Sequence, residues 1–508
     1  MHGGLHFAAH TPAKQSLAPN HRSPCNTMTQ VAFFRIACAR GIGYDARMSY
    51  DLIVIGGGPA GYVGAIRAAQ LGKRVVVVER DRVGGTCLNW GCIPTKALLQ
   101  NAELYHTLAA RATEFGIQAE GVAVDWPAVI ARSRQISDRL SGGIAFLFKK
   151  NKIDHVAGEA RIVAPGKVEV EAEDGTSSTL EGANILIATG ARTREVPVFP
   201  FNGKTIIGSK DALTLPKLPG SMIVIGSGAI GTELSYVYHC FGTKVTLVEA
   251  LPRILPNEDD DVCTAMERAF KKRGITCMAG AKVESLQDNG ESVTATITAK
   301  NGKTQEVTAD VCLVAVGVAP VVPQAEGLEL TERGFIKVDD RYATNLPGVY
   351  AAGDCIGGIM LAHTASYEAE QAVEGMFVEG HTPLHPGLVP GCTYCHPQVA
   401  SVGKRERELK EAGVEYKVGK FPFQAIGRAV AAGETEGFVK LLFGAEHGEL
   451  LGAHIMGEGA TELIATPELG MSAELTDADM NAMIYAHPTM AEAIHEAVLA
   501  ADGRAIHA

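Results

Sequence analysis

The sequence predicts an α/β protein in which one strand–turn–helix–strand unit occurs twice, with an α+β domain at the C-terminal end. Glycine-rich turns at residues 56–61 and 226–231 each follow a short apolar strand and precede a helix. From about residue 391 the pattern changes to alternating β segments followed by alanine-rich helices. At 508 residues the chain is long enough for three or four domains, and its 57 glycines fit a fold rich in tight turns.

Charge and cysteine content exclude several classes of protein. The net charge of −11 argues against non-specific binding to nucleic acid. Eleven cysteines, with no regular spacing apart from two local pairs, are more typical of a reduced compartment than of a secreted disulfide scaffold. The sequence has no apolar run of the roughly 18 residues that a membrane span requires. We therefore expect a cytoplasmic enzyme that binds neither nucleic acid nor membrane and holds no metal.

Residues 1–47 differ in character from the rest of the chain. They carry one acidic residue, Asp45, against five basic ones: Lys14, Arg22, Arg35, Arg40 and Arg47. An organelle transit peptide has this composition, and the protein would then belong in an organelle matrix. The alternative is a translated upstream segment, with the true start at Met48 directly before the first strand. We favour Met48, and the segment takes no part in the predicted fold.

The first unit has every landmark of a dinucleotide-binding βαβ motif. An apolar strand at residues 52–55 leads into a turn and a helix, and a second buried strand at residues 75–78 ends in Glu79. The glycines of the turn are Gly56, Gly58 and Gly61. Such a turn places phosphates at the helix N-terminus, and an acid at the end of the second strand accepts hydrogen bonds from a ribose.

The second unit repeats the first at a shift of 170 residues, from Gly56 to Gly226. Its corresponding residues are Gly226, Gly228, Gly231 and Glu249. Glu249 would bind a free ribose 2′-hydroxyl and repel a 2′-phosphate, and the nearest basic residue, Arg253, lies four positions further on. The chain therefore has two dinucleotide sites, of which the second should prefer NAD over NADP.

The segments around these units complete the two sheets. Residues 95–115 and 125–150 are predicted as long helices and residues 153–180 as hairpins. Strands at residues 185–190 and 312–317 return to the first and second sheets, ending at Thr189-Gly190 and at Gly317. A further strand ends in Gly353-Asp354, where the acid could hold a sugar or ribityl hydroxyl, although an isolated Gly-Asp turn is a weak signal. The predicted domains are 48–195, 196–320, 321–390 and 391–508, after the excluded segment 1–47.

Two cysteines stand five positions apart, at Cys87 and Cys92. In a regular helix their Cα atoms would be about 8.7 Å apart, beyond the roughly 6.8 Å limit for a disulfide. A bridge therefore requires a distorted turn, which Gly91 allows, with Pro94 starting a helix behind it. The alternative is a pair of buried thiols that never pair, because free cysteine packs like a small hydrophobe.

Near the C-terminus, His487 and Glu492 have the spacing of a histidine held by a carboxylate. Pro488 is predicted in the first turn of a helix that runs to Ala500. A positioned imidazole with a carboxylate partner can act as a general acid or base. The alternative is a His-Pro turn with a solvated glutamate.

Taken together, these motifs resemble the flavin-dependent pyridine nucleotide-disulfide oxidoreductases. Within that family the chain is most similar to the members that oxidise dihydrolipoyl groups as the E3 component of 2-oxo acid dehydrogenase complexes. The resemblance covers nearly everything from Met48 onward. It rests on the two glycine turns with their acids, residues 85–96, residues 344–354 and residues 487–492. It implies FAD in the first unit, NAD in the second, a central domain and a C-terminal dimerisation domain.

The resemblance also implies roles for individual residues. Cys87 would be the sulfur that a dihydrolipoyl thiolate attacks, and Cys92 would face the flavin. His487 would reach the disulfide of the other subunit and take the thiol proton, with Glu492 holding its imidazole. Lys96 would lie near the flavin, paired with Glu233, and Asp354 would hold the ribityl chain. The implied FAD residues are Gly56, Gly58, Gly61, Glu79, Lys96, Thr189, Gly190, Gly353 and Asp354. The implied NAD residues are Gly226, Gly228, Gly231, Glu233, Glu249 and Gly317.

The implied partners are a second copy of the chain and a lipoyl-bearing acyltransferase or other lipoyl carrier protein. Nothing in the residues selects one 2-oxo acid or glycine-cleavage complex. Glutathione-reductase-like enzymes are the nearest alternative, but they use NADP and would need arginines near the position of Glu249. A non-catalytic flavoprotein redox sensor is a second alternative, which would have no use for His487. Residues 392–396 also spell a c-type haem attachment pattern or a second dithiol, although here they align with an interface strand of the family.

Overall fold

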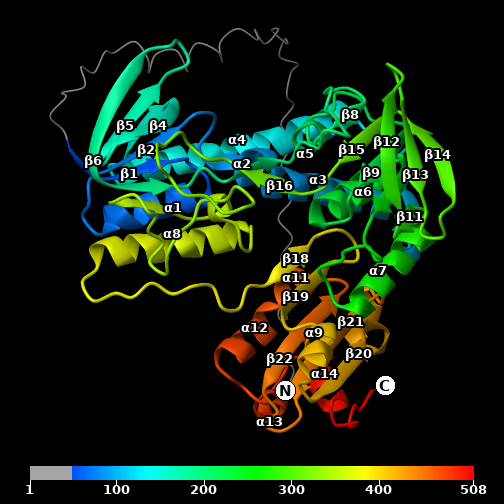
Figure 1. Ribbon diagram of the computed structural model, residues 1–508. Coiled ribbons are helices and arrows are strands. Elements are labelled where there is room, and N and C mark those ends of the chain that lie inside the picture. The colour runs from blue at the N-terminus through cyan, green and yellow to red at the C-terminus, as the bar shows by residue number, and fades with distance from the viewer. Residues whose placement is uncertain (1–48, 508) are drawn as a thin grey trace, which may run out of the picture. The chain divides into compact units, whose positions relative to one another are not determined.

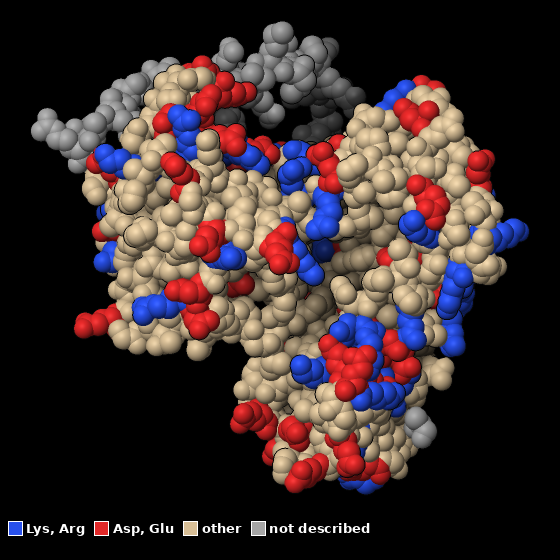
Figure 2. All heavy atoms as spheres, viewed as in Figure 1, with Lys and Arg blue, Asp and Glu red and all other residues tan. Residues whose placement is uncertain are grey.

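The computed structural model describes residues 49–507, and the elements of this part are labelled in Figure 1. The predictions for residues 1–47 lie outside the described residues. Within residues 49–507, no helix combines the length and the hydropathy that crossing a bilayer requires. On the face shown in Figure 2, acidic and basic side chains are interspersed among uncharged ones.

A seven-stranded sheet organises the first unit, with strand order β3-β2-β1-β6-β5-β4 and β17 paired to β6. β1 lies parallel to both β2 and β6, so the β-branched residues of its interior are covered on both faces. The strands are β1 (Tyr50–Ile55), β2 (Val75–Glu79), β3 (Asp154–Ala157), β4 (Glu159–Ala164), β5 (Lys167–Glu171), β6 (Ser177–Ile187) and β17 (Val349–Ala351).

Helices pack on this sheet through a close approach at a glycine. α1 and α8 lie side by side in Figure 1, and a Cβ at Gly64 of α1 would come within 3.5 Å of Ala369 on α8 and 2.9 Å of Leu186. The helical segments of this part are α1 (Pro59–Gln70), α2 (Gly85–Trp90), α3 (Cys92–His106), the π-helical turn η1 (Thr107–Arg111), the 3₁₀ turn η2 (Ala112–Phe115), α4 (Trp126–Lys150), the 3₁₀ turn η3 (Asp354–Ile356) and α8 (Ala362–Phe377).

The second unit is a parallel sheet in the order β11-β10-β9-β15-β8, with an antiparallel sheet β12-β13-β14 beside it. The register of β9 with β10 repeats that of β1 with β2, as the duplicated sequence predicts. Its strands are β8 (Ile206–Ile207), β9 (Ser221–Ile225), β10 (Lys244–Glu249), β11 (Thr276–Ala279), β12 (Lys282–Asp288), β13 (Val293–Thr298), β14 (Thr304–Ala309) and β15 (Val311–Val314). Its helices are α5 (Ser209–Ala212), α6 (Ala229–Cys240) and α7 (Asp260–Arg273). The short strands β7 (Ala191–Thr193) and β16 (Val318–Pro320) pair where the chain passes between the two units.

The C-terminal part is an antiparallel sheet in the order β18-β19-β22-β21-β20. Its strands are β18 (Gly391–Thr393), β19 (Val399–Gly403), β20 (Tyr416–Pro422), β21 (Phe438–Gly444) and β22 (Leu450–Met456). Its helices are α9 (Glu406–Ala412), the 3₁₀ turn η4 (Phe423–Ala425), α10 (Gly427–Ala432), α11 (Ala460–Leu463), α12 (Ala465–Ser472), α13 (Asp477–Ala482) and α14 (Glu492–Ala500). The predicted α+β character of this part is confirmed.

Two predictions of local structure need correction. The helix expected to begin at Pro488 begins at Glu492 instead, because residues 487–491 form a turn closed by side chains: Thr489 donates from its N–H to Glu492 and from its hydroxyl to Ala486. Residues 154–157, expected in a hairpin, form β3 and extend the parallel sheet beside β2. The hairpins proper join β4, β5 and β6.

A buried lysine ties the second unit to the C-terminal sheet. Lys440 on β21 has 1% of its side chain exposed, and its ammonium lies 2.8 Å from Asp259, 3.2 Å from Asp261 and 2.6 Å from Glu406. Asp259 also caps the N-terminus of α7, where its carboxylate accepts from the N–H of Asp261. Burial opposes the charge of Lys440, but the carboxylates of Asp259 and Glu406 raise its pKa overall. The charge is therefore satisfied only as long as all these elements are packed together.

We predict that Lys440→Met destabilises the protein by about 3 to 5 kcal/mol, because it leaves the buried carboxylate of Asp259 without its cation. Thermal unfolding of the protein should show a lower Tm. The matched control is Lys282→Met, since Lys282 and its partner Glu284 are 72% and 40% exposed. This control should change stability by no more than about 0.5 kcal/mol. Equal effects of the two substitutions would contradict the role given to Lys440.

Candidate active site

The predicted distortion between Cys87 and Cys92 is present. α2 ends at Trp90 and α3 begins at Cys92, and Gly91 between them has φ −146° and ψ −113°, outside the helical region. A Cβ at Gly91 would lie 3.0 Å from the carbonyl oxygen of Thr86, so a side chain there would press on the turn. Both cysteines are free thiols, each partly buried, and the two side chains are joined by a hydrogen bond.

The two sulfurs have opposite electrostatic environments. The hydrogen bond from Cys87 and the charge of Lys96 lower the pKa of Cys92 to about 7, although burial opposes them. The pKa of Cys87 is raised, first because it donates that bond and then because it is buried. The thiolate of the pair therefore forms at Cys92 at a lower pH than at Cys87. Burial, followed by the charges of Cys87 and Cys92, raises the pKa of Tyr62.

Lys96 connects this dithiol to the second unit. Its ammonium on α3 lies 3.0 and 2.9 Å from the two carboxylate oxygens of Glu233 on α6, whose side chain is only 3% exposed. The backbone N–H of Tyr394 donates to Glu233 at 2.9 Å, and the ring of Tyr394 lies 4.3 Å below the Lys96 ammonium. The expected Lys96–Glu233 pairing is confirmed. Both oxygens of Glu233 are engaged inside the protein, and its role in holding NAD stays a prediction.

The first glycine turn has the shape needed for a dinucleotide. Gly56 has φ +103°, and a Cβ there would lie 2.3 Å from the carbonyl oxygen of Ala188. A Cβ on Gly61 would lie 1.8 Å from the carbonyl oxygen of Gly56, so the start of α1 can approach the strand only with glycine here. The nearest atom to a Cβ on Gly58 would be 3.7 Å away. No side chain caps the N-terminus of α1, which leaves its N–H groups for an anion.

The same features recur in the second turn. Gly226 has φ +96°, and a Cβ there would lie 2.5 Å from the carbonyl oxygen of Ala315. A Cβ on Gly231 would lie 1.9 Å from the carbonyl oxygen of Gly226, and one on Gly228 would meet nothing within 4 Å. The N-terminus of α6 is also without a side-chain cap. Both turns therefore fit a pyrophosphate at the start of a helix.

The glutamate that ends the second strand of each unit accepts a hydrogen bond from an N–H of the glycine turn. Glu79 accepts from the N–H of Gly57 at 2.7 Å, and Glu249 accepts from the N–H of Ser227 at 2.8 Å. These bonds fix each carboxylate beside its glycine turn, where a ribose would lie. Arg253, the nearest basic residue in sequence to Glu249, forms an ion pair with Asp260. It is therefore already occupied rather than free to receive a 2′-phosphate.

A small cavity of about 100 Å³ opens beside the first turn. Its lining includes Gly56, Glu79 and Thr189, which the resemblance assigns to FAD, together with residues 321–323. The hydroxyl of Thr189 donates to the carbonyl of Val321, which fixes this wall. The cavity fits one part of a dinucleotide.

Asp354 follows β17, as predicted, at the start of the 3₁₀ turn η3. Burial raises the pKa of Asp354, and no other described residue donates a hydrogen bond to its carboxylate. Its neighbour Gly353 donates from its N–H to the buried Glu368 at 2.8 Å, and burial raises the pKa of Glu368 to about 7. A partly buried carboxylate that still needs hydrogen-bond donors suits the hydroxyls of a ligand.

His487 and Glu492 pair as expected, with 2.9 Å between Nδ1 and the carboxylate, which leaves Nε2 for chemistry. The side chain of His487 is 77% exposed, and among residues 49–507 no hydrogen bond or ion pair joins it to Cys87. The structure of one chain therefore does not bring these two residues together. Gly190 and Gly317 lie in the loops that follow β6 and β15, and both have positive φ.

The cysteines of the second motif differ from the Cys87–Cys92 pair, because burial raises the pKa of both. Cys395 is fully buried, and burial raises its pKa; burial also raises the pKa of Cys392 to about 11. Thiols in this state are poor nucleophiles, and the buried Cys395 has no room for a haem attached to it. The segment forms β18 and the loop after it, which hold Tyr394 against Lys96.

Sequence reasoning missed the roles of Tyr62, Glu368 and Tyr394. The sequence feature that could have pointed to Tyr62 is its position in the first turn of α1, directly after the glycine turn. No sequence pattern places Tyr394 on Lys96, because the two are 298 positions apart and meet only in the folded chain.

Comparison with known proteins agrees with this geometry. Residues 50–369 match the pyridine nucleotide-disulphide oxidoreductase family, and residues 389–498 match its dimerisation domain. The chain belongs to this family. Its members pair FAD with a pyridine nucleotide, and the cofactors of this chain are FAD and NAD, in agreement with the two glycine turns.

Curated relatives cover most of the chain. A dihydrolipoyl dehydrogenase from Zymomonas mobilis is 44% identical over 463 residues, which is 90% of this chain and 99% of the relative. A dihydrolipoyl dehydrogenase from Bacillus subtilis is 42% identical and also covers 90% of this chain and 99% of its own length. Dihydrolipoyl dehydrogenase 1, mitochondrial, from Arabidopsis thaliana is 40% identical and covers 96% of this chain and 97% of its own length.

Solved structures show the same fold. LpdA from Mycobacterium tuberculosis matches with a TM-score of 0.81 at 28% identity, over 88% of this chain and 98% of LpdA. The HOCl-induced flavoprotein disulfide reductase RclA from Escherichia coli matches with a TM-score of 0.79 at 26% identity, over 89% of this chain and all of RclA. The predicted fold class of two nucleotide-binding units and a C-terminal dimerisation domain is confirmed.

We predict that the thiolate of Cys92 forms with a midpoint at about pH 7 in the reduced protein, against the ordinary 9.0. The measurement is a pH titration of ultraviolet thiolate absorbance, taken as the difference between the wild type and Cys92→Ser. Because a lowered pKa means that the charge is present above the midpoint, the thiolate should be lost as the pH falls through 7. Lys96→Met removes a positive charge and should raise this midpoint. A wild-type midpoint at 9 or above would contradict the electrostatic environment described for Cys92.

Proposed function

We propose that this protein oxidises protein-bound dihydrolipoyl groups to lipoyl groups and reduces NAD⁺ to NADH. The observation that carries the proposal is the pair Cys87 and Cys92 on either side of the helix break at Gly91, with Lys96, on the same helix as Cys92, paired with Glu233. The curated relatives named dihydrolipoyl dehydrogenase support this choice over other disulfide reductases. The overall reaction balances, since two thiols give up two electrons and two protons, NAD⁺ takes a hydride, and one proton is released.

In the oxidising direction, Cys87 is the sulfur that receives the substrate. A dihydrolipoyl thiolate attacks the Cys87–Cys92 disulfide at Cys87, and Cys92 leaves as a thiolate, which the positive charge of Lys96 favours. The second substrate thiol then displaces Cys87, and the lipoyl disulfide forms. A base must remove the substrate's thiol protons, because only thiolates attack. Bound FAD supplies the two-electron acceptor between the thiols and NAD⁺.

We assign that base to His487, with Glu492 holding the imidazole through Nδ1. The exposed position of His487 supports a role towards the Cys87 of a second subunit rather than towards its own. Ile484, three residues before it, is 98% exposed, which suits a surface that is covered in a dimer. We therefore propose a homodimer in which each active site takes its base from the partner chain.

The remaining site residues follow from the same proposal. FAD would lie along the first turn and the cavity beside it, with the Lys96 ammonium near the flavin and Asp354 on the ribityl chain. NAD would lie along the second turn, with its ribose on Glu249. We keep the predicted domain boundaries at residues 195, 320 and 390 as part of the proposal.

The partner that carries the lipoyl group would be an acyltransferase core or another lipoyl carrier protein. We place the protein in the cytoplasm, in line with the bacterial relatives, or in an organelle matrix if residues 1–47 act as a transit peptide. Relatives from Arabidopsis thaliana are named mitochondrial.

A direct assay tests the proposal. The purified holoenzyme should reduce NAD⁺ with dihydrolipoamide far faster than it reduces NADP⁺, because Glu249 repels a 2′-phosphate and Arg253 is paired with Asp260. It should not reduce glutathione disulfide at a comparable rate with NADPH. A preference for NADPH and glutathione disulfide would reassign the protein to the glutathione-reductase-like branch of the family.

We predict that His487→Gln lowers the rate of dihydrolipoamide oxidation by about two to four orders of magnitude while FAD stays bound, because the base is lost. Cys87→Ser should abolish the rate. The chain offers a matched control in His507→Gln, since His507 also pairs through Nδ1 with a glutamate of α14, Glu496, at 2.7 Å, and its side chain is 68% exposed. The control should keep nearly full activity. Similar losses in both histidine variants would show that the effect is structural and would remove His487 as the base.

A further inference from the structure

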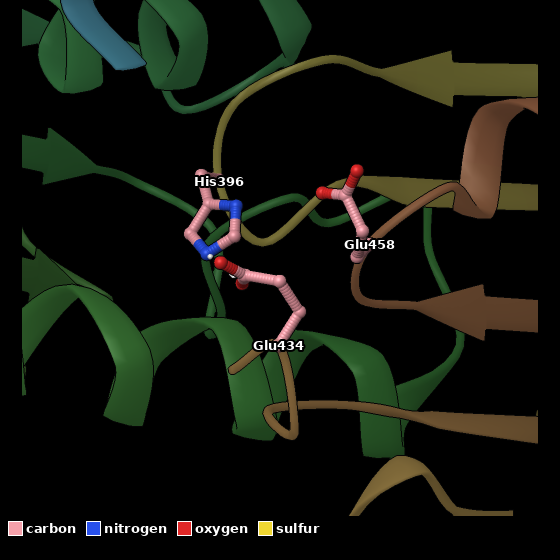
Figure 3. A group of neighbouring side chains, drawn as sticks. All are labelled: His396, Glu434 and Glu458. Carbon is pink, nitrogen blue, oxygen red and sulfur yellow. Dashed lines mark ion pairs between the residues drawn. The ribbon is translucent and has the colours of Figure 1, made fainter. Parts of the chain in front are cut away.

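Three acid and imidazole groups converge at one end of the C-terminal sheet. His396 lies in the loop between β18 and β19, Glu434 in the loop between α10 and β21, and Glu458 two residues after the end of β22. Figure 3 shows the carboxylate of Glu434 pointing at the ring of His396, with the carboxylate of Glu458 set apart from both. A possible ligand atom from each lies within 4.8 Å of those of the other two. Residues from three separate loops are thus brought together only by the fold.

The three side chains differ in how many hydrogen-bond and ion-pair partners they have. His396 Nε2 lies 3.1 Å from Glu434, and these side chains are only 12% and 17% exposed. The other oxygen of Glu434 accepts from the guanidinium of Arg111. The Glu458 side chain makes no hydrogen bond and no ion pair with any other residue in the described range 49–507. Burial, followed by the charges of Glu434 and Glu103, raises its pKa in spite of the opposing effect of His396. Glu458 is therefore the member of the cluster whose carboxylate has no hydrogen-bond or ion-pair partner within residues 49–507.

The spacing fits a divalent cation. For metal–ligand distances of about 2.1 Å, adjacent ligand atoms of an octahedral ion are about 3 Å apart and opposite ones about 4.2 Å apart. The pair of His396 and Glu434 already has the shorter spacing. Glu458 lies between Gly457 and Gly459, and a small shift of its side chain would bring it within the longer one. Arg111 would continue to hold the outer oxygen of Glu434, as hydrogen-bond donors do for ligating carboxylates.

A second acidic cluster in the same chain already contains a positive group. Asp259, Asp261 and Glu406 converge equally closely, but the ammonium of Lys440 lies 2.6 to 3.2 Å from all three. In the His396 cluster no lysine takes that place among the described residues. Arg273, the other nearby cation, pairs with Glu436 at 2.8 Å.

We propose that His396, Glu434 and Glu458 form a binding site for a divalent transition-metal ion, with water completing its coordination. One imidazole and two carboxylates suit manganese, iron or zinc, which accept mixed nitrogen and oxygen ligands. His396 is two residues from Tyr394, whose N–H donates to Glu233. An ion at this position would therefore bind to the loop that supports the Lys96–Glu233 pair. The site is separate from the dithiol and does not depend on the function proposed above.

The test is a titration of the holoenzyme with Mn²⁺, in which free Mn²⁺ is followed by electron paramagnetic resonance. Mn²⁺ is the probe because thiolates bind it weakly, so the Cys87–Cys92 pair does not compete. We expect one Mn²⁺ per chain in the wild type. Glu458→Gln should weaken binding by roughly tenfold or more, because a neutral amide replaces a charged ligand. This variant should fold normally, since the Glu458 side chain makes no bond to another described residue.

His396→Asn is the second variant, and it should also weaken binding. Glu446→Gln, which changes a carboxylate that is 86% exposed, is the control and should bind like the wild type. Added Mn²⁺ should raise the Tm of the wild type and of the control more than that of Glu458→Gln, because a ligand that binds the native state stabilises it. Absence of binding in the wild type, or equal affinity in the wild type and Glu458→Gln, would overturn the proposal.

Discussion

The ion pair between Lys96 and Glu233 is the interaction on which the arrangement of this molecule depends. Lys96 belongs to the helix that follows the dithiol, Glu233 to the helix of the second glycine turn, and Tyr394, which contacts both, to the C-terminal part. Glu233 is almost completely buried, so its charge is tolerated only while the ammonium of Lys96 remains in place. Such a pair adds little net stability, but it fixes where the three parts of the chain meet.

The same pair sets the chemistry of the sulfurs. The positive charge of Lys96 favours the thiolate of Cys92, whereas the negative charge of Glu233 opposes it at longer range. The hydrogen bond from Cys87 adds to the first effect and keeps the proton on Cys87. A single lysine thus contributes both to the packing of two units and to the difference between two otherwise identical thiols. The break at Gly91 is required for this difference, because it places the thiols within hydrogen-bonding reach.

The two βαβ units form their glycine turns in the same way. In both copies the first glycine has positive φ and the third glycine packs against the carbonyl of the first, so the same steric conditions recur. The acid after the second strand is also held by an N–H of the turn in both copies. The copies differ in the hydroxyl of Ser227, which gives Glu249 a further donor that Glu79 lacks at the matching Gly57. Local sequence therefore determines the fold of each unit. A single substitution in the turn, Ser227 for Gly57, changes the number of hydrogen bonds that the glutamate accepts.

The sequence by itself determined the two βαβ units, the dithiol turn and the His487–Glu492 pair, because each is a short-range pattern whose geometry follows from backbone sterics and nearby hydrogen bonds. It did not determine where the helix after Pro488 begins, since the bonds from the N–H of Thr489 to Glu492 and from its hydroxyl to Ala486 override the preference of proline for a first helical turn. Nor could it show that Tyr394 covers Lys96, that Lys440 is buried among three carboxylates, or that His396 meets Glu434 and Glu458. Those contacts join residues far apart in the chain. Only the packing of whole sheets against one another brings such residues within reach, and no local pattern encodes that packing.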